Sequence, residues 1–228
     1  MWIIFAFILT INIENMSTFV GKKFPNISVD AMNEMGDTFK VNVLEEAVKN
    51  KKKVVLFWYP KDFTYVCPTE LHAFQEALPE FDKRNTILIG ASCDTPEVHF
   101  AWLSTPKDNG GIEGVTYSIL ADANRNLANI LKVLDTTNER YDEELDAVQT
   151  DGDSTPYRAT FILDEDGMVF HQGMNFFPVG RNINEFLRLI DAYAHNQKFG
   201  EVCPANWEEG KDAMKENRDG VADYLAKH

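Results

Sequence analysis

The residues best suited to chemistry lie around Cys67, in the stretch PKDFTYVCPTE at residues 60–70. A cysteine becomes a strong nucleophile when its thiol is ionised. Cys67 follows an apolar segment and opens a helical pattern, and Pro68 suits a first helical turn. Free backbone N–H groups and the positive end of a helix dipole stabilise a thiolate there. The pattern therefore favours a reactive cysteine over a buried structural one.

The segments on either side of Cys67 are expected to hold it in place. Residues 53–59 (KVVLFWY) predict a buried strand. Residues 65–83 predict a helix, because their apolar residues recur at spacings of three, four and three. These residues are Leu71, Phe74, Leu78 and Phe81. Pro79 lies inside this helix and is expected to kink or shorten it.

The rest of the chain alternates between the two kinds of element. Strands are expected at 86–92, 117–121, 158–163 and 168–173, and helices at 96–105, 124–132 and 182–196. The last two strands are joined by Asp-Glu-Asp-Gly at 164–167, a hairpin signal. This order predicts one α/β domain whose central sheet is covered by helices on both faces.

A resemblance to a known family becomes visible in the motifs. Pro60, Thr64 and Cys67 meet the pattern P-x-x-x-T-x-x-C, and FTYVCPTE resembles the active-site signature of typical 2-Cys peroxiredoxins, a group that includes the peroxidase component of alkyl hydroperoxide reductase. Three further segments resemble that family in the same order: YRATFILD with Arg158, PVGRNINEFLRLIDA with Arg181, and GEVCPANW with Cys203. The resemblance runs from about Phe24 to near the C-terminus, apart from one insertion, and implies a thioredoxin-like fold: a central mixed sheet flanked by helices, with a C-terminal arm.

This resemblance implies a thiol peroxidase that reduces hydrogen peroxide and organic hydroperoxides. Cys67 would be the peroxidatic nucleophile and would leave the reaction as a sulfenic acid. Thr64 would orient the peroxide through its hydroxyl. Pro60 would shield the sulfur from water.

Three charged residues would support the reaction. Arg158 would stabilise the thiolate and the negative charge that develops on the leaving oxygen. Glu70 would hold the arginines by charge-assisted hydrogen bonds, and Arg181 would join that network.

Cys203 is the expected resolving cysteine, which condenses with the sulfenic acid to a disulfide. The family resemblance implies that it comes from the partner subunit of a homodimer, whereas its spacing alone leaves pairing within one chain open. Thioredoxin or a flavoprotein disulfide reductase would then reset the enzyme, and no cofactor is required. Dimers would assemble into decamers. Cys93, at a strand end in GASCD, is expected to be structural.

The composition limits the classes of binding partner and the cellular compartment that we expect for this chain. The net charge of −14 disfavours nucleic acid as a partner. The three cysteines are sparse and have no metal-clip spacing, and the five histidines form no ligand pattern, so no metal site is expected. Sparse cysteines suit a reducing compartment, and the cytoplasm is the expected location.

The chain divides into three parts, the second of which contains an insertion. Residues 1–15 form an apolar extension, with a run of about eleven apolar residues that is too short to span a bilayer. A membrane tether or an atypical signal stays an alternative to a spurious extension, although the membrane is not an expected partner. Residues 16–199 are the expected domain, and 200–228 the arm with the resolving cysteine. Within the domain, the acidic insertion 136–156 is expected to be a solvated loop, the alternative being a specificity lid or docking loop.

Two elements bear on overoxidation. Family members that overoxidise easily carry a Gly-Gly-Leu-Gly loop and a C-terminal Tyr-Phe; here residues 110–113 read Gly-Gly-Ile-Glu and residues 224–225 read Tyr-Leu. Both elements are half present, so intermediate to robust behaviour is expected. A holdase chaperone and a peroxide sensor are the alternative functions, and the complete Pro60, Thr64, Cys67 and Arg158 set favours the peroxidase.

Overall fold

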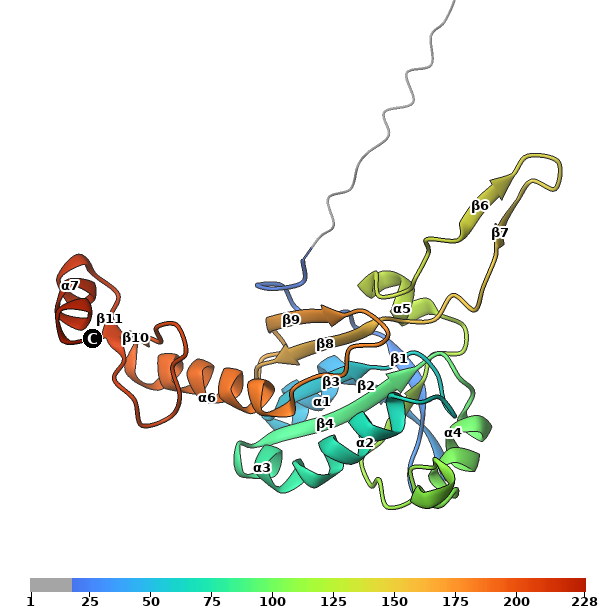
Figure 1. Ribbon diagram of the computed structural model, residues 1–228, viewed down its shortest axis with the longest axis horizontal. Coiled ribbons are helices and arrows are strands. Elements are labelled where there is room, and N and C mark those ends of the chain that lie inside the picture. Colours follow the sequence, from blue (N-terminus) through green and yellow to red (C-terminus); the bar gives the residue numbers. More distant parts are fainter. Residues whose placement is uncertain (1–17) are drawn as a thin grey trace, which may run out of the picture.

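A computed structural model describes residues 18–228, and the apolar extension 1–15 lies outside the described part. A seven-stranded sheet forms the centre (Figure 1). Its strands, in spatial order, are β2 (Thr38–Asn42), β1 (Ser28–Met32), β5 (Ile119–Ala121), β4 (Thr86–Ser92), β3 (Lys53–Trp58), β8 (Arg158–Leu163) and β9 (Val169–Asn175). The β3–β4 and β4–β5 pairs are parallel and the others antiparallel, which confirms the expected mixed sheet.

Helices cover both faces of the sheet. The helices are α1 (Val43–Asn50), α2 (Cys67–Glu76), α3 (Leu78–Lys83), α4 (Pro96–Leu103), α5 (Asn126–Leu131), α6 (Ile183–Phe199) and α7 (Arg218–Lys227), with a 3-10 turn at Lys107–Asn109. One buried cluster joins alternate β3 residues to α1 and α5, and the other joins the remaining β3 residues to α2, α3, α4 and α6. All six residues of β3 are buried, which fits the apolar run of residues 54–58.

The prediction of one continuous helix over residues 65–83 is wrong. The chain forms α2 and α3 instead, with Ala77 as the break between them. Pro79 lies in the first turn of α3, where its missing N–H costs nothing, whereas inside a longer helix it would remove a hydrogen bond. Pro79 therefore shortens the helix, as its position predicts.

The turn between β8 and β9 forms where the Asp-Gly signal places it. The Asp164 carboxylate accepts hydrogen bonds from the backbone N–H groups of Asp166 and Met168. Gly167 has a φ of 78°, and a side chain there would collide with Leu44, since an added Cβ would lie 2.1 Å from its Cδ1. Only glycine satisfies both conditions.

The acidic insertion is a hairpin rather than an irregular loop. β6 (Glu139–Asp142) pairs antiparallel with β7 (Ala147–Thr150), and the hairpin projects from the body of the protein (Figure 1). Tyr141 and Val148 lie directly opposite each other and are exposed.

The C-terminal arm extends from α6 at the opposite end of the molecule from the hairpin (Figure 1). It contains a short ladder of β10 (Glu201–Val202) and β11 (Met214–Lys215), then α7. Gly200 ends α6 in the left-handed conformation, at φ 67°. Within residues 18–228, none of the helices has the length and apolar character needed to cross a membrane.

Candidate active site

Cys67 is the first residue of α2 and is completely buried. β3 ends at Trp58, and residues 59–66 connect it to α2; residues 60–66 are called here the catalytic loop. The N-cap residue Val66 has no side-chain acceptor, and Pro68 lies in the first turn. The backbone N–H groups of Thr69 and Glu70 in this turn donate to the Val66 oxygen at 3.1 and 3.3 Å, and the positive end of the helix dipole favours a negative charge near Cys67.

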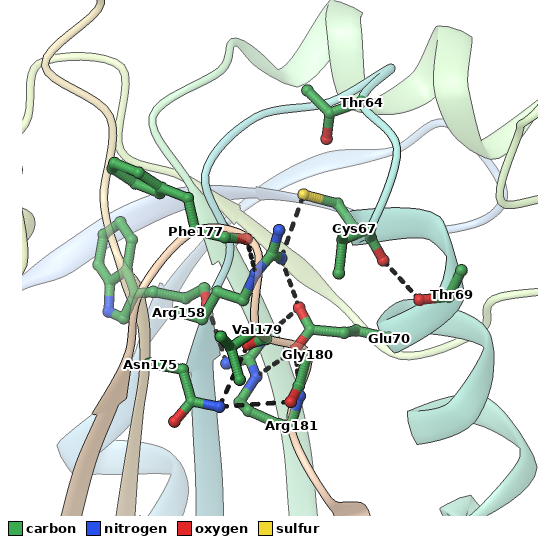
Figure 2. Close-up of polar contacts among 12 residues, drawn as sticks. Thr64, Cys67, Thr69, Glu70, Arg158, Asn175, Phe177, Val179, Gly180 and Arg181 are labelled. Carbon is green, nitrogen blue, oxygen red and sulfur yellow. Dashed lines mark hydrogen bonds and ion pairs between the residues drawn. The ribbon is translucent and has the colours of Figure 1, made fainter.

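Arg158, the first residue of β8, reaches Cys67 directly (Figure 2). Its Nη1 lies 3.4 Å from the Cys67 Sγ and 2.7 Å from Glu70 Oε2. Its Nε donates to the backbone oxygen of Phe177 at 2.8 Å. The guanidinium is thus fixed from two sides, with one N–H group directed at the sulfur.

Glu70 and Arg181 form the second half of this network (Figure 2). Arg181 Nε lies 2.8 Å from Glu70 Oε1, and Arg181 Nη2 lies 2.9 Å from Glu70 Oε2. Arg181 Nη1 also donates to the backbone oxygens of Trp58 and Ala159, and its guanidinium lies 5.1 Å from the Phe57 ring centroid. Glu70 therefore joins α2 to β8 and to the chain segment before α6.

The charges of this cluster balance only when a further anion is present. Arg158 and Arg181 contribute two positive charges and Glu70 one negative charge, with all three side chains almost fully buried. Burial alone would raise the pKa of Glu70, but the charges and hydrogen bonds of Arg181 and Arg158 outweigh it and hold that pKa below its usual value. The cluster thus carries one net positive charge, and the Cys67 Sγ lies beside it, 3.4 Å from Arg158 Nη1.

Thr64 and Pro60 lie on the catalytic loop above this cluster. Thr64 donates its hydroxyl hydrogen to the backbone oxygen of Lys61 at 2.9 Å, and its oxygen points toward the side where the Cys67 sulfur lies (Figure 2). A hydroxyl that has donated its one hydrogen still has acceptor capacity for another donor. Pro60 follows the β3 strand and is half-buried.

Sequence reasoning missed a buried polar cluster that anchors the same loop. Asp62 accepts from the Tyr59 hydroxyl at 2.7 Å, and its other oxygen lies 2.7 Å from His99 Nδ1. The backbone N–H of Asp62 donates to Asp94 at 2.9 Å. Burial raises the pKa of Asp62 despite the opposing effect of His99. The sequence offered no signal for this contact beyond a histidine on a helix and an aspartate in the motif.

The outer side of the catalytic loop is apolar and exposed. Phe63 is 54% exposed and Tyr65 is 96% exposed. The Phe63 ring lies 5.9 Å from the ring of buried Trp102 on α4. Phe63 has a φ of 55°, an uncommon value for an aromatic residue, so the loop makes a sharp reversal at this point.

The other two cysteines lie outside the cluster. Cys93 is half-buried against the core at the end of β4, and burial raises its pKa to about 12. Cys203 is half-buried in the arm, where its Sγ lies 3.5 Å from the backbone oxygen of Ala192 on α6. Burial also raises the pKa of Cys203. All three cysteines are free thiols in this structure.

The two elements linked to overoxidation are separate in this chain. The backbone oxygen of Gly111 lies 3.1 Å from His72 Nε2, so the Gly-Gly loop rests against α2. Gly111 has no room for a side chain, because an added Cβ would lie 1.9 Å from the Thr105 backbone oxygen. Glu113 is exposed, and Leu225 on α7 is 68% exposed.

Comparisons with known proteins agree with this geometry. The AhpC/TSA family profile matches residues 20–172, and the profile described as the C-terminal domain of 1-Cys peroxiredoxin matches residues 192–227. Alkyl hydroperoxide reductase C of Helicobacter pylori is 36% identical over 211 residues, which cover 90% of this chain and 96% of that protein. Peroxiredoxin-2 of Bos taurus is 37% identical over 209 residues, covering 92% and 96%.

A solved structure supports the same relationship. The reduced 2-Cys peroxiredoxin of Plasmodium vivax superposes with a TM-score of 0.82 at 37% identity, covering 92% of this chain and all of that one. The fold, a buried cysteine at a helix start beside an arginine, and the similarity over nearly the whole chain lead to one conclusion: this chain belongs to the AhpC/TSA family of peroxiredoxins and is a thiol peroxidase of the antioxidant class.

Proposed function

We propose that Cys67 is the peroxidatic nucleophile of this thiol peroxidase. The observation that carries the proposal is the 3.4 Å contact between Arg158 Nη1 and the Cys67 Sγ, within a buried cluster that lacks one negative charge. The thiolate attacks one peroxide oxygen and the O–O bond breaks. Cys67 becomes a sulfenic acid, and the other oxygen leaves as water or an alcohol after it takes up a proton.

Thr64, Pro60 and Arg158 assist this step in the proposed mechanism. Thr64 accepts a hydrogen bond from the peroxide, since its own hydrogen is already donated to the Lys61 backbone oxygen. Arg158 donates to the sulfur and to the oxygen that gains charge, which lowers the barrier electrostatically. Pro60 shields the sulfur from water, while Glu70 and Arg181 keep Arg158 in place.

Cys203 of a second subunit is the proposed resolving residue. In its own chain Cys203 packs beside Ala192, about 13 Å along the helix axis from the start of α6, and the arm extends away from the sheet (Figure 1). Its thiol attacks the Cys67 sulfenic acid, a disulfide forms and water leaves. Because Cys67 is buried, the catalytic loop and the first turn of α2 must open before the two sulfurs can meet.

A homodimer is the proposed working unit, with decamers as its further assembly. β9 is an edge strand of the central sheet; Val169 at its start pairs with the backbone of residues 21 and 22, and the rest of its outer side pairs with no other strand of residues 18–228. Three apolar side chains in and after it are exposed: Met174, Phe176 and Val179. An exposed apolar sheet edge is a surface that a second copy can cover.

Thioredoxin or a flavoprotein disulfide reductase is the proposed reductant of the disulfide. The cytoplasm is the proposed compartment, since sparse free cysteines suit a reducing environment.

Peroxide consumption by the purified protein tests the assignment. We expect turnover of hydrogen peroxide with a thioredoxin system and loss of that turnover in the Cys67→Ser variant. Turnover that survived in Cys67→Ser would place the chemistry at another residue.

A further inference from the structure

The acidic insertion contacts the catalytic loop through one ion pair, made by a residue that follows the β6–β7 hairpin. After β7 the chain returns toward β8, and on the way the Asp153 Oδ2 lies 2.7 Å from the Nζ of Lys61. Lys61 is the loop residue directly after Pro60. The hydrogen bond to Asp153 raises the pKa of Lys61, and the reverse contact lowers the pKa of Asp153, so both side chains are charged at neutral pH.

Hydrogen bonds to neighbouring segments hold the backbone around Asp153 in place. Arg125 Nη2 donates to the backbone oxygen of Asp153 at 3.3 Å, and Arg125 Nε donates to that of Ser154 at 3.4 Å. On the far side of the turn, the backbone N–H of Asp135 donates to the oxygen of Thr155 at 2.9 Å. The carboxylate is therefore presented to Lys61 from a segment tied to α5 and to the start of the insertion.

Lys61 in turn orients Thr64. The Thr64 hydroxyl donates its single hydrogen to the Lys61 backbone oxygen at 2.9 Å. The position of that backbone oxygen decides where the Thr64 oxygen points and which acceptor directions are left for a peroxide. The contact of Asp153 with the Lys61 side chain can therefore affect the orientation of the Thr64 hydroxyl, with Lys61 as the single residue between them.

We propose that Asp153 is a positioning residue: through Lys61 it holds the catalytic loop in the arrangement that presents Thr64 to the peroxide, and it opposes the opening of that loop for disulfide formation. This inference rests on the proposed roles of Cys67, Thr64 and Cys203. It gives the insertion a role, because the residues that follow β7 bring the Asp153 carboxylate to the loop. Loss of the contact should therefore slow the first chemical step and speed up the second.

The test compares Asp153→Asn with Asp151→Asn. Both variants remove one negative charge from the segment that follows β7. The Asp151 carboxylate, however, lies 4.0 Å from Arg140 of the hairpin and forms its ion pair there. In stopped-flow measurements with hydrogen peroxide, Asp153→Asn should form the sulfenic acid about threefold more slowly, the size expected for an exposed ion pair. Its Cys67–Cys203 disulfide should then form faster by a similar factor, and Asp151→Asn should match the wild type in both steps.

Two further variants separate positioning from general damage to the fold. Asp153→Glu keeps the carboxylate and should restore both rates. Lys61→Gln combined with Asp153→Asn should behave like either single variant, because both remove the same contact. A variant that is merely less well folded would slow both steps, and Asp153→Glu would not rescue it.

Salt gives an independent readout. Hydrogen peroxide is uncharged, so charge steering does not affect its encounter with the enzyme, whereas an exposed ion pair is screened by salt. Raising the salt concentration should bring the wild-type rate of sulfenic acid formation toward that of Asp153→Asn, which itself should change little.

Amide hydrogen exchange tests the contact without any turnover. Exchange in residues 61–66 should be faster in Asp153→Asn than in Asp151→Asn. Equal exchange and equal rates in the two variants would overturn the positioning role while peroxide consumption through Cys67 continued. Faster exchange in a protein that does not react with peroxide at Cys67 would instead overturn the proposed function and leave only the loop contact standing.

Discussion

Arg158 Nη1 donates to two acceptors at once, the Cys67 Sγ at 3.4 Å and Glu70 Oε2 at 2.7 Å. The carboxylate holds the arginine, and the arginine meets the sulfur. The strength of the arginine–sulfur contact therefore depends on Glu70, whose carboxylate bonds the two arginines rather than the sulfur.

Replacing Cys67 by Ser should abolish peroxide reduction, because a serine hydroxyl is not ionised near neutral pH. Cys93→Ser is the matched control and should keep most of the activity, since burial raises the pKa of Cys93 to about 12 and leaves it a protonated core residue. Peroxide consumption with a thioredoxin system measures both. An inactive Cys93→Ser with a normal fold would count against the structural role of Cys93.

Arg158→Lys should slow the reaction with peroxide at least tenfold, which corresponds to about 1.4 kcal/mol in the barrier. Lysine keeps the charge but loses the planar fork that reaches sulfur, Glu70 and the Phe177 backbone together. Arg140→Lys, on the exposed hairpin, is the control. Pre-steady-state rates with hydrogen peroxide measure the effect, and equal rates in both variants would remove Arg158 from the chemical step.

Glu70→Gln should lower the free energy of unfolding by about 3 kcal/mol at neutral pH, because it leaves two buried guanidinium groups without their partner. The folded-state pKa of Glu70 is depressed, so its stabilisation is present above the unfolded value of about 4.3 and is lost as pH falls through the folded value. The gap between wild type and variant should therefore shrink in acid.

Urea denaturation across that pH range measures this gap. Glu76→Gln, on the exposed side of the same helix, should cost little at any pH. A gap that stayed constant into acid would mean that Glu70 is not ionised in the folded protein.

Cys203→Ser should consume about one peroxide per Cys67 and then stall as a sulfenic acid. Wild-type protein treated with peroxide should run as a disulfide-linked dimer on a non-reducing gel, and dithiothreitol should collapse it. Burial raises the pKa of Cys203, so the rate of disulfide formation should increase with pH from neutral upward. A disulfide confined to monomers would mean that Cys203 acts within its own chain.

Glu113→Gly combined with Leu225→Phe should shift Cys67 toward overoxidation. Within one chain α7 lies away from the Gly-Gly loop, so this packing would come from the arm of the second subunit, where the charged Glu113 and the smaller Leu225 should pack less well than Gly and Phe. The catalytic loop then opens more readily and Cys203 captures the sulfenic acid sooner. Mass spectrometry of Cys67 at rising peroxide measures sulfinic acid, and identical curves for both proteins would exclude these positions as the control.

The local part of the site could be predicted from the sequence. β3 has a long apolar run and α2 begins at a motif with proline in its first turn, so the position of Cys67 follows from neighbouring residues. The places of Arg158 and Arg181 could not be worked out in this way. They depend on the antiparallel pairing of β8 with β3, a contact across about a hundred residues of chain, and only the family resemblance indicated it.

Two features of the structure have no recognisable pattern in the amino-acid sequence. The Asp62–His99 contact joins residues 37 apart, and a single buried histidine has no characteristic spacing. The β6–β7 hairpin packs neither face on the core, so no alternation of apolar and polar residues marks its strands. Pro79 indicated that the helix would break, but it did not indicate that the break would fall at Ala77.

Trp102 lies 5.9 Å from the Phe63 ring of the catalytic loop, and Trp207 is buried beside His195 at the base of the arm that carries Cys203. An indole thus lies at each of the two segments that the proposed reaction rearranges: Trp102 of α4 contacts the loop, and Trp207 belongs to the arm. Opening of the loop takes the Phe63 ring away from Trp102, and movement of the arm exposes Trp207. The intrinsic fluorescence of this chain should therefore change when either segment moves, and a Trp207→Phe variant removes the contribution of the arm and leaves those of Trp2, Trp58 and Trp102.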